Sequence, residues 1–335
     1  MDASPIPVET HTLYAERSLG RLPGAFTEKK IKGEDYLYFQ ASQSGGTTKQ
    51  FYLGRKTPAL RRMVETFVRE RAGWSADLDR LRRLAAQLRA GGINTTDGPS
   101  GRVLQAFSDS GLFEAGAVLV GTHAFVTLGN VLGVRWGAGA TRTHDVDLAS
   151  GPDGDIEVAV PDIEVDVPAV LESLKAGFLP VPSLDSAKAS TSFKVRGQAL
   201  RVDLLCPKRG ARDTPLFIKR FNAAAQPLEF IEYLLEAPER AVVIGRVGIL
   251  VKVPAPARFA LHKLVVAEVR PAALQVKAVK DRAQARAILH ILVENRPGDI
   301  SLAWRAATAH GARFKKRPVD TGRRIIPIAL TANRT

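Results

Sequence analysis

The fold is decided by two stretches, Ala117-Val118-Leu119-Val120-Gly121-Thr122-His123-Ala124-Phe125 and, further along the chain, Thr141-Arg142-Thr143-His144-Asp145-Val146-Asp147-Leu148. The first is a short apolar run that ends in Gly-Thr, which predicts a strand followed by a helix. The second places two carboxylates one residue apart in an apolar frame. Because alternate residues of a strand point to the same face, Asp145 and Asp147 should project side by side.

Two carboxylates this close repel each other unless a cation lies between them. A hard divalent ion with oxygen ligands, Mg²⁺ first and Mn²⁺ as its substitute, suits the pair. A helix that opens at Thr122 or His123 offers backbone N–H groups and a positive dipole end, which suit a phosphate. Metal-binding carboxylates and a phosphate site together are the components of phosphoryl or nucleotidyl transfer.

A third carboxylate is predicted on the strand Leu200-Arg201-Val202-Asp203-Leu204-Leu205, where Asp203 stands among apolar residues. Two rival stretches, 155–158 and 164–166, also alternate acidic and apolar residues. They rank lower because neither follows the Gly-Thr turn at a strand–helix–strand distance. His123 and His144 flank the motifs, and we interpret them as packing residues or as supports of the site.

These residues resemble the nucleotidyltransferase superfamily of DNA polymerase β type, with its Gly-Ser turn, Asp-x-Asp strand and third acidic strand. More narrowly, they resemble bacterial nucleotidyltransferases that include the abortive-infection type IV toxins. The resemblance covers Gly116 to Cys206 well and the later helices more loosely. Thr122 replaces the usual serine and keeps its hydroxyl, and the segment between Gly121 and Asp145 is longer than in minimal members.

The resemblance implies an α+β fold, with a mixed sheet of the nucleotidyltransferase type and helices around it. It also implies transfer of a nucleoside monophosphate from ATP or another NTP, with Mg²⁺ or Mn²⁺ bound and pyrophosphate released. Asp145, Asp147 and Asp203 are then the catalytic and metal-binding residues, and Asp203 receives the proton of the acceptor hydroxyl. Gly121 and Thr122 are expected to bind the nucleotide.

Two further nucleotide-binding residues come from the same resemblance. In the toxin-like relatives, a lysine on a helix after the catalytic sheet contacts the nucleotide phosphates, and Lys263 matches it. Relatives also carry a basic residue followed by Asp, which matches Lys280-Asp281. The residues themselves leave alternatives open: Lys263 as an ordinary surface lysine, and Asp281 as a structural ion-pair partner of Lys263 or an arginine.

The 335 residues carry 45% hydrophobic and 24% charged residues, an ordinary balance for a globular protein. No apolar run is long enough to span a membrane, residues 1–12 lack a signal-peptide core, and Cys206 is the single cysteine. A cytoplasmic location and no membrane partner are therefore expected. The net charge of +14 favours nucleic acid as a partner, and a general basic bias of the proteome is the alternative explanation.

Three regions are expected along the chain: an N-terminal β-hairpin and helical module (1–110), the nucleotidyltransferase core (111–225) and a mainly helical region with a basic tail (226–335). In the first region, strands at 26–31, 35–40 and 50–53 interleave aromatic and basic residues. Such a sheet can stack bases and contact phosphates. The alternative is a small sheet that uses its aromatic residues as its own core.

The remaining elements are predicted from helical periodicity and turn residues. One helix should start at Thr57-Pro58 and a second should run from Ser75 to about Ala90. Residues 91–101 are interpreted as a linker that leads to a short helix at 102–108. After residue 207 the chain is expected to be irregular and then largely helical from Pro227, with strands only within 241–253.

The favoured acceptor is RNA, for example a tRNA 3′ end, because of the basic charge. The resemblance also allows a protein hydroxyl or a small molecule as the acceptor. It suggests a link to toxin–antitoxin systems, and hence an antitoxin or regulatory protein as a partner. A hypothesis from another class is a nucleic-acid-binding protein with an inactive transferase core, and intact Asp145, Asp147 and Asp203 argue against it.

Overall fold

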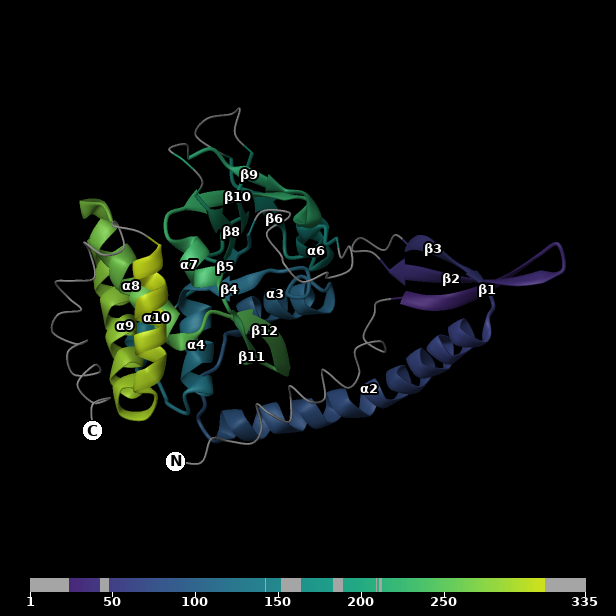
Figure 1. Cartoon of the computed structure of the whole chain (residues 1–335), viewed down its shortest axis with the longest axis horizontal. Helices are drawn as coiled ribbons and strands as arrows, with labels where there is room; N and C mark the ends of the chain where they lie inside the picture. Colours follow the sequence, from purple (N-terminus) through teal and green to yellow (C-terminus); the bar gives the residue numbers. More distant parts are fainter. Residues whose placement is uncertain are drawn as a thin grey trace.

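A seven-stranded sheet forms the centre of the computed structural model, which describes residues 24–42, 48–141, 143–151, 164–182, 189–208, 210 and 213–310 (Figure 1). The main strand order is β4-β5-β8-β10-β9, and β7 also pairs with β8 and with β6. The strands are β4 (Val118–Val120), β5 (Asp145–Ala149), β6 (Phe178–Pro180), β7 (Ser192–Val195), β8 (Arg201–Pro207), β9 (Leu216–Ile218) and β10 (Ala223–Leu228). The pairs β5–β8 and β8–β10 are parallel and the others antiparallel, so the predicted mixed sheet and α+β fold are confirmed.

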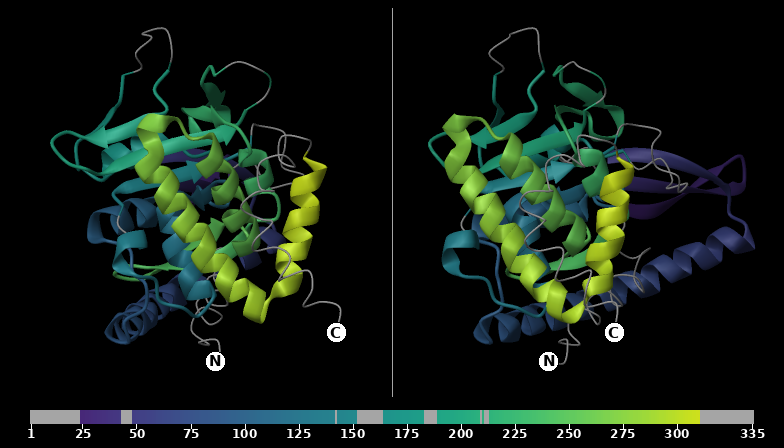
Figure 2. Two further views of the ribbon diagram at one scale, coloured as in Figure 1. Left: turned by 90° about the vertical axis from the view of Figure 1, so that its left-hand side faces the viewer. Right: turned by 60° about the vertical axis from the view of Figure 1, so that its left-hand side comes forward.

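Helices and a separate hairpin pack on this sheet. One hydrophobic cluster, which runs in sequence from Val103 to Ala307, joins them. Figure 2 shows the long C-terminal helices together on one side of the sheet. The elements are α3 (Gly98–Asp109), α4 (Gly121–Val131), α5 (Ala138–Thr141), α6 (Val167–Ser173), α7 (Ile231–Leu235), β11 (Glu239–Ile244), β12 (Gly248–Val253), α8 (Pro256–Val269), α9 (Gln275–Asn295) and α10 (Pro297–Ala309), with 3₁₀ turns η1 (Lys219–Phe221) and η2 (Ala272–Leu274).

The N-terminal region is an arm made of a three-stranded antiparallel sheet and a long helix. Its elements are β1 (Gly24–Ile31), β2 (Glu34–Ser42), β3 (Thr48–Arg55) and α2 (Pro58–Ala90). The predicted cap is present, since the Leu60 N–H donates to Thr57 Oγ1 at 3.3 Å. Figure 1 shows the sheet at the far end of α2, away from the central sheet. The C-terminal end of α2 is attached to the body, where Arg89 donates to the Gly245 carbonyl at 2.5 Å.

Three sequence predictions about element boundaries were wrong. The two helices predicted before residue 91 are one 33-residue helix, because Gly73 costs a helix only about 1 kcal/mol and does not end it. The predicted linker contains the start of α3, which Asp97 caps by accepting from the Ser100 N–H at 2.6 Å. Pro227 lies in β10 and not in a helix. Its register partner there is Cys206 of β8, while β9 covers only 223–225.

Other predictions hold or fall outside the described residues. The paired strands around 196–198 and within 241–253 are present, and the C-terminal helices begin near the predicted residues. Three segments lie outside the described part of the chain: the residues before Gly24, which were expected to be loose, the strand expected at 155–160 and the basic tail after residue 313. Among the helices described, none combines the length and the hydrophobicity needed to cross a lipid bilayer.

Candidate active site

The three predicted catalytic carboxylates come together on two neighbouring strands. The parallel register of β5 and β8 sets Asp147 opposite Asp203 and Asp145 opposite Arg201. Residues paired in this way share a face of the sheet, and Asp145 and Asp147 alternate along β5, so all three carboxylates project to the same side. The residues between them, Val146, Leu148, Val202 and Leu204, are buried in the core. On both strands, the residues that alternate with the acids are buried, as the period-two pattern of the sequence predicted.

The electrostatics of Asp147 show how crowded this face is. Residue 147 is half-buried by surface area, but its carboxylate lies deep enough that burial is the largest cause of a raised pKa, which reaches about 7. The Asp203 carboxylate raises this pKa further and Asp145 adds to it, while Lys263 and Lys277 lower it. The site thus combines three acids with at least two cations.

The Gly-Thr turn lies directly against this cluster. The antiparallel register of β4 and β5 pairs Val120 with Asp147, and Gly121 follows with a φ of +66°. A β-carbon on Gly121 would lie 1.9 Å from Asp147 Oδ2, so only glycine fits beside this carboxylate. Helix α4 begins at Gly121, and no side chain caps its N-terminus. Thr122 is buried in the first turn, so this end of α4 meets the carboxylate cluster as predicted.

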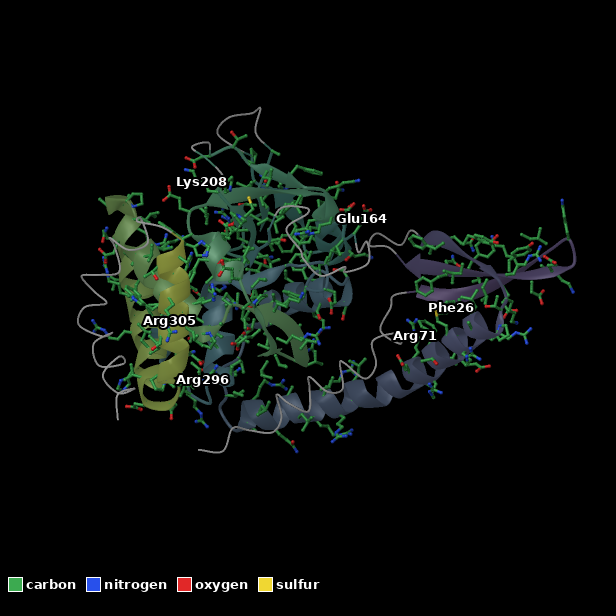
Figure 3. The ribbon with its side chains drawn as sticks, viewed as in Figure 1. Phe26, Arg71, Glu164, Lys208, Arg296 and Arg305 are labelled. Atoms are coloured by element: carbon green, nitrogen blue, oxygen red, sulfur yellow. The ribbon has the colours of Figure 1, made fainter. Side chains whose placement is uncertain are left out.

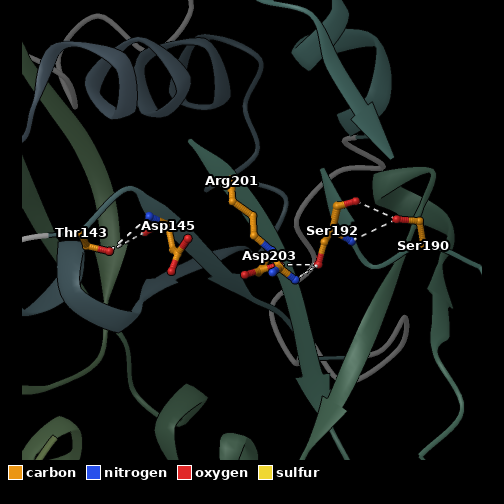
Figure 4. A network of polar contacts seen from close by, with 6 residues as sticks. All are labelled: Thr143, Asp145, Ser190, Ser192, Arg201 and Asp203. Atoms are coloured by element: carbon orange, nitrogen blue, oxygen red, sulfur yellow. Dashed lines mark hydrogen bonds and ion pairs between the residues drawn. The ribbon is translucent and has the colours of Figure 1, made fainter. Parts of the chain in front are cut away.

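The Asp203 carboxylate has two partners that the sequence did not indicate. Arg201 Nε donates to Asp203 Oδ1 at 2.7 Å, and Ser192 on β7 donates its hydroxyl to the same oxygen. A second Arg201 nitrogen donates to Ser192 Oγ at 2.9 Å, which closes the triangle. Figure 4 shows this network, with the carboxylates of Asp145 and Asp203 facing each other across neighbouring strands.

Two signals could have revealed these partners. Arg201 stands two residues before Asp203, hence on the same face of β8. Ser192 is the register partner of Asp203 across the predicted hairpin. The threonine before β5 also supports the site, because the Asp145 N–H donates to Thr143 Oγ1 at 3.1 Å (Figure 4). This hydrogen bond fixes the backbone at the start of β5, where Asp145 carries the first of the three predicted catalytic carboxylates.

The donor set suits a hard divalent cation, because Asp145, Asp147 and Asp203 supply only carboxylate oxygens. Across the described ranges, however, no three His, Cys, Asp or Glu side chains already stand in an arrangement that could hold a metal ion. Asp203 Oδ1 accepts hydrogen bonds from Arg201 and Ser192. A divalent metal ion fits this site in its chemistry, and Asp145, Asp147 and Asp203 would hold it.

Two cations, Lys263 of α8 and Arg270 at the C-terminal end of α8, pair with Asp281 of α9. Lys263 Nζ donates to Asp281 Oδ1 at 2.7 Å, and Arg270 Nε donates to Asp281 Oδ2 at 2.6 Å. The Asp281 side chain is only 5% exposed, and that of Lys263 is 12% exposed. Lys263 is therefore not an ordinary surface lysine. Asp281 makes the ion pairs of the structural alternative, one with Lys263 and one with Arg270.

Lysines on α9 also face the carboxylates. Lys277 acts on the charge of Asp147. Burial lowers the pKa of Lys280 and Lys263 lowers it further, while Asp281, Asp145 and Asp147 raise it. Lys277, Lys280 and Asp281 are spaced three and four residues apart, on one face of the helix. That spacing is the signal that would have added Lys277 to the predicted site.

The other titratable candidates do not join this cluster. His123 is buried with a pKa lowered to about 4, chiefly by burial, so it is a neutral packing residue. His144 is exposed, with Nδ1 3.8 Å from Asp97 Oδ2, so it does not pack in the core. Of the rival acidic stretches, 155–158 lies outside the described residues, and Asp166 is the N-cap of α6.

Comparison with known proteins agrees with this site. A family model described as nucleotidyltransferase matches residues 99–309, more than half of the chain, so the chain belongs to that nucleotidyltransferase family. Membership supports a nucleotidyl-transfer function, and the matched residues include the turn, the three carboxylates and the lysines of α8 and α9.

Similarity outside the family model is limited. One similar solved structure is that of an antigenic nucleotidyltransferase-like protein from Paracoccidioides brasiliensis. It is 16% identical, the match covers 62% of this chain and 94% of that one, and the TM-score is 0.30. No curated protein matches the chain.

Proposed function

We propose that this protein transfers a nucleoside monophosphate from an NTP to a hydroxyl of an RNA acceptor, with a divalent metal ion bound. One observation carries the proposal: Asp145, Asp147 and Asp203 share a face of β5 and β8, between the N-terminus of α4 and the lysines of α8 and α9. Acids that hold a metal and cations that hold phosphate are both required for attack on an α-phosphorus.

The proposed metal ligands are Asp145, Asp147 and Asp203. Bound Mg²⁺ or Mn²⁺ would neutralise the triphosphate and acidify the acceptor hydroxyl. Burial and the neighbouring carboxylates raise the pKa of Asp147 to about 7, so a bound cation would favour its charged form. The raised pKa of Asp147 therefore supports the proposal that this carboxylate binds a cation.

The proposed roles divide the site into an acceptor side and a phosphate side. Asp203 comes from a different strand than the other two acids, and we assign it to the acceptor, where it takes the hydroxyl proton once Arg201 has moved away. Thr122 and Lys263 are assigned to the triphosphate. Asp281 holds the ammonium group of Lys263 in place rather than contacting the anionic phosphates itself.

Labelling tests the proposal. The protein is incubated with each α-labelled NTP in turn, with Mg²⁺ or Mn²⁺, and with total RNA or a lysate as the source of acceptors. We expect the label to enter RNA and to be lost on ribonuclease treatment. A label that resists ribonuclease and yields to protease identifies a protein acceptor, and a label of low molecular mass identifies a small molecule. No labelled product with any acceptor would support the inactive-core alternative.

A further inference from the structure

The arm sheet has two different faces, and among the elements that the structure describes α2 covers one of them. Phe26 of β1 and Phe39 of β2 are register partners, and both contact Phe67 of α2, with ring centroids 5.0 and 6.1 Å from it. Arg71 of α2 also donates to the carbonyl of Gly24. Figure 3 labels Phe26 and Arg71 where the sheet meets the helix. These phenylalanines are the core that the sequence suggested for the arm.

The opposite face carries three tyrosines in place of the phenylalanines. Tyr36 and Tyr38 alternate on β2, and Tyr52 is the register partner of Tyr38 on β3. Their ring centroids lie 6.0 Å apart for Tyr36–Tyr52 and 5.4 Å apart for Tyr38–Tyr52. Tyr52 is 61% exposed, the largest exposed fraction among the exposed aromatic residues of the described chain. A contiguous aromatic platform of this kind has no function as a core.

Basic groups surround the tyrosine face. Lys29, on the same face, has its Nζ 4.8 Å from the centre of the Tyr38 ring and donates to Gln50 Oε1 at 2.7 Å. Arg55 is the register partner of Tyr36, and its exposed side chain pairs with that of Glu34, with Nε 2.9 Å from Oε2. In sequence, residues 24–90 hold 14 Lys and Arg against 7 Asp and Glu, so this arm carries half of the chain's net charge of +14. An anionic partner is therefore favoured over a second copy of this basic arm.

We propose that the tyrosine face binds single-stranded RNA, with bases stacked on Tyr52 and its neighbours and phosphates held by Lys29 and Arg55. Stacking needs an exposed ring and phosphate binding needs cations beside it, and this face supplies both. The proposed RNA binding depends only on the features of the arm and not on the proposed catalytic activity. The further role of presenting the RNA as the acceptor rests on the proposed nucleotidyl transfer.

Fluorescence anisotropy with a labelled single-stranded RNA and the full chain tests the binding. Tyr52→Ala should weaken binding by about 5- to 150-fold, the usual range for loss of one stacking ring, whereas Tyr52→Trp should restore it. Phe51→Ala is the matched control. Phe51 is the register partner of Phe39, is 43% exposed and adjoins Tyr52, but it points to the other face of β3. The Phe51→Ala variant should bind RNA with the affinity of the wild-type protein.

Salt dependence and a catalytic variant complete the test. For each phosphate contact, the RNA affinity should fall by about 0.7 log units when the salt concentration rises tenfold. Lys29→Ala should reduce this slope by about 0.7, the value for one phosphate contact. Asp147→Asn should keep wild-type RNA affinity while losing transfer, which separates this proposal from the proposed function. Equal RNA affinities for wild type, Tyr52→Ala and Phe51→Ala would overturn the proposal. If Tyr52→Ala then shifts the oligomeric state in sedimentation, the face binds another protein chain instead.

Discussion

Two buried acidic regions of this protein differ in how their charge is balanced. On α9, Asp281 is enclosed by two cations, with Lys263 and Arg270 each on one of its oxygens. On β5, Asp147 faces two other carboxylates, and its pKa rises to about 7. The first region is balanced within the protein, whereas at Asp147 burial and two neighbouring carboxylates outweigh the lysines that act on its charge. A buried carboxylate whose charge the protein does not neutralise indicates a ligand site. A buried carboxylate that is fully ion-paired indicates a structural role.

The largest expected effect is at the unbalanced region. Asp147→Asn, and equally Asp145→Asn, should lower nucleotide transfer below detection, because a neutral amide cannot hold the metal ion. The fold should persist, since removing one charge relieves repulsion among the carboxylates. Rates with α-labelled NTP and unfolding curves measure the two effects. Glu164→Gln is the control, because this exposed acid belongs to the rival stretch; a loss of transfer in that variant would undermine the assignment.

The second prediction separates the acceptor side from the phosphate side. Asp203→Ala should bind a non-hydrolysable NTP with Mg²⁺ but transfer nothing. Lys263→Ala should weaken NTP binding, and its rate defect should shrink at high NTP, while Lys194→Ala, an exposed lysine on β7, behaves as wild type. Isothermal titration and single-turnover transfer measure both. The roles are wrongly assigned if Asp203→Ala loses NTP affinity as fully as Asp145→Ala does.

The third prediction concerns the balanced region. Asp281→Ala should destabilise the protein by about 3–5 kcal/mol, because it leaves two cations buried without their partner. Glu268→Ala is the matched control. Its pair with Arg282 at 3.1 Å also joins α8 and α9, but both side chains are more than one-third exposed, so the cost should be about 0–1 kcal/mol. Urea unfolding measures both, and equal costs would show that burial does not distinguish the pairs.

The last prediction is a pH dependence of stability in the metal-free protein, whose size is comparable to that of the third. The folded-state pKa of Asp147 is raised from 3.8 to about 7, so its contribution is most favourable below pH 4 and is lost as the pH rises toward 7. The slope from this group is at most about 1.4 kcal/mol per pH unit. Asp147→Asn should remove it, so the difference between wild-type and variant unfolding free energies should change sharply between pH 4 and pH 7. A constant difference would mean that this carboxylate is not perturbed.

Local patterns in the sequence predicted the site wherever strand periodicity or a turn determined it. Gly121, the Asp145/Asp147 pair and Asp203 each lie in a strand or turn whose pattern is contained in a few residues. The pairing of Arg201 with Asp203 and Ser192 depends on the register of two strands, β7 and β8, which the sequence does not state. Lys277 was missed for a related reason, since its position on α9 matters only once that helix packs beside the sheet.

The arm shows the same limit. Sequence reasoning offered two uses for its aromatic residues, and the structure assigns the phenylalanines to a core with α2 and the tyrosines to the opposite face. The sequence alone could not separate them, because a helix that covers one face of a sheet is a tertiary contact. The continuity of α2 through Gly73 is likewise a balance between a small propensity cost and the helical residues on both sides.

The most direct test of the account compares two labels on the same NTP. With RNA, Mg²⁺ and the wild-type protein, α-labelled NTP should label the RNA, whereas γ-labelled NTP should leave the RNA unlabelled and release labelled pyrophosphate. Asp147→Asn should produce neither product. Transfer of the γ-label to RNA, or labelling by the α-label that survives in Asp147→Asn, would contradict nucleotidyl transfer by these three carboxylates.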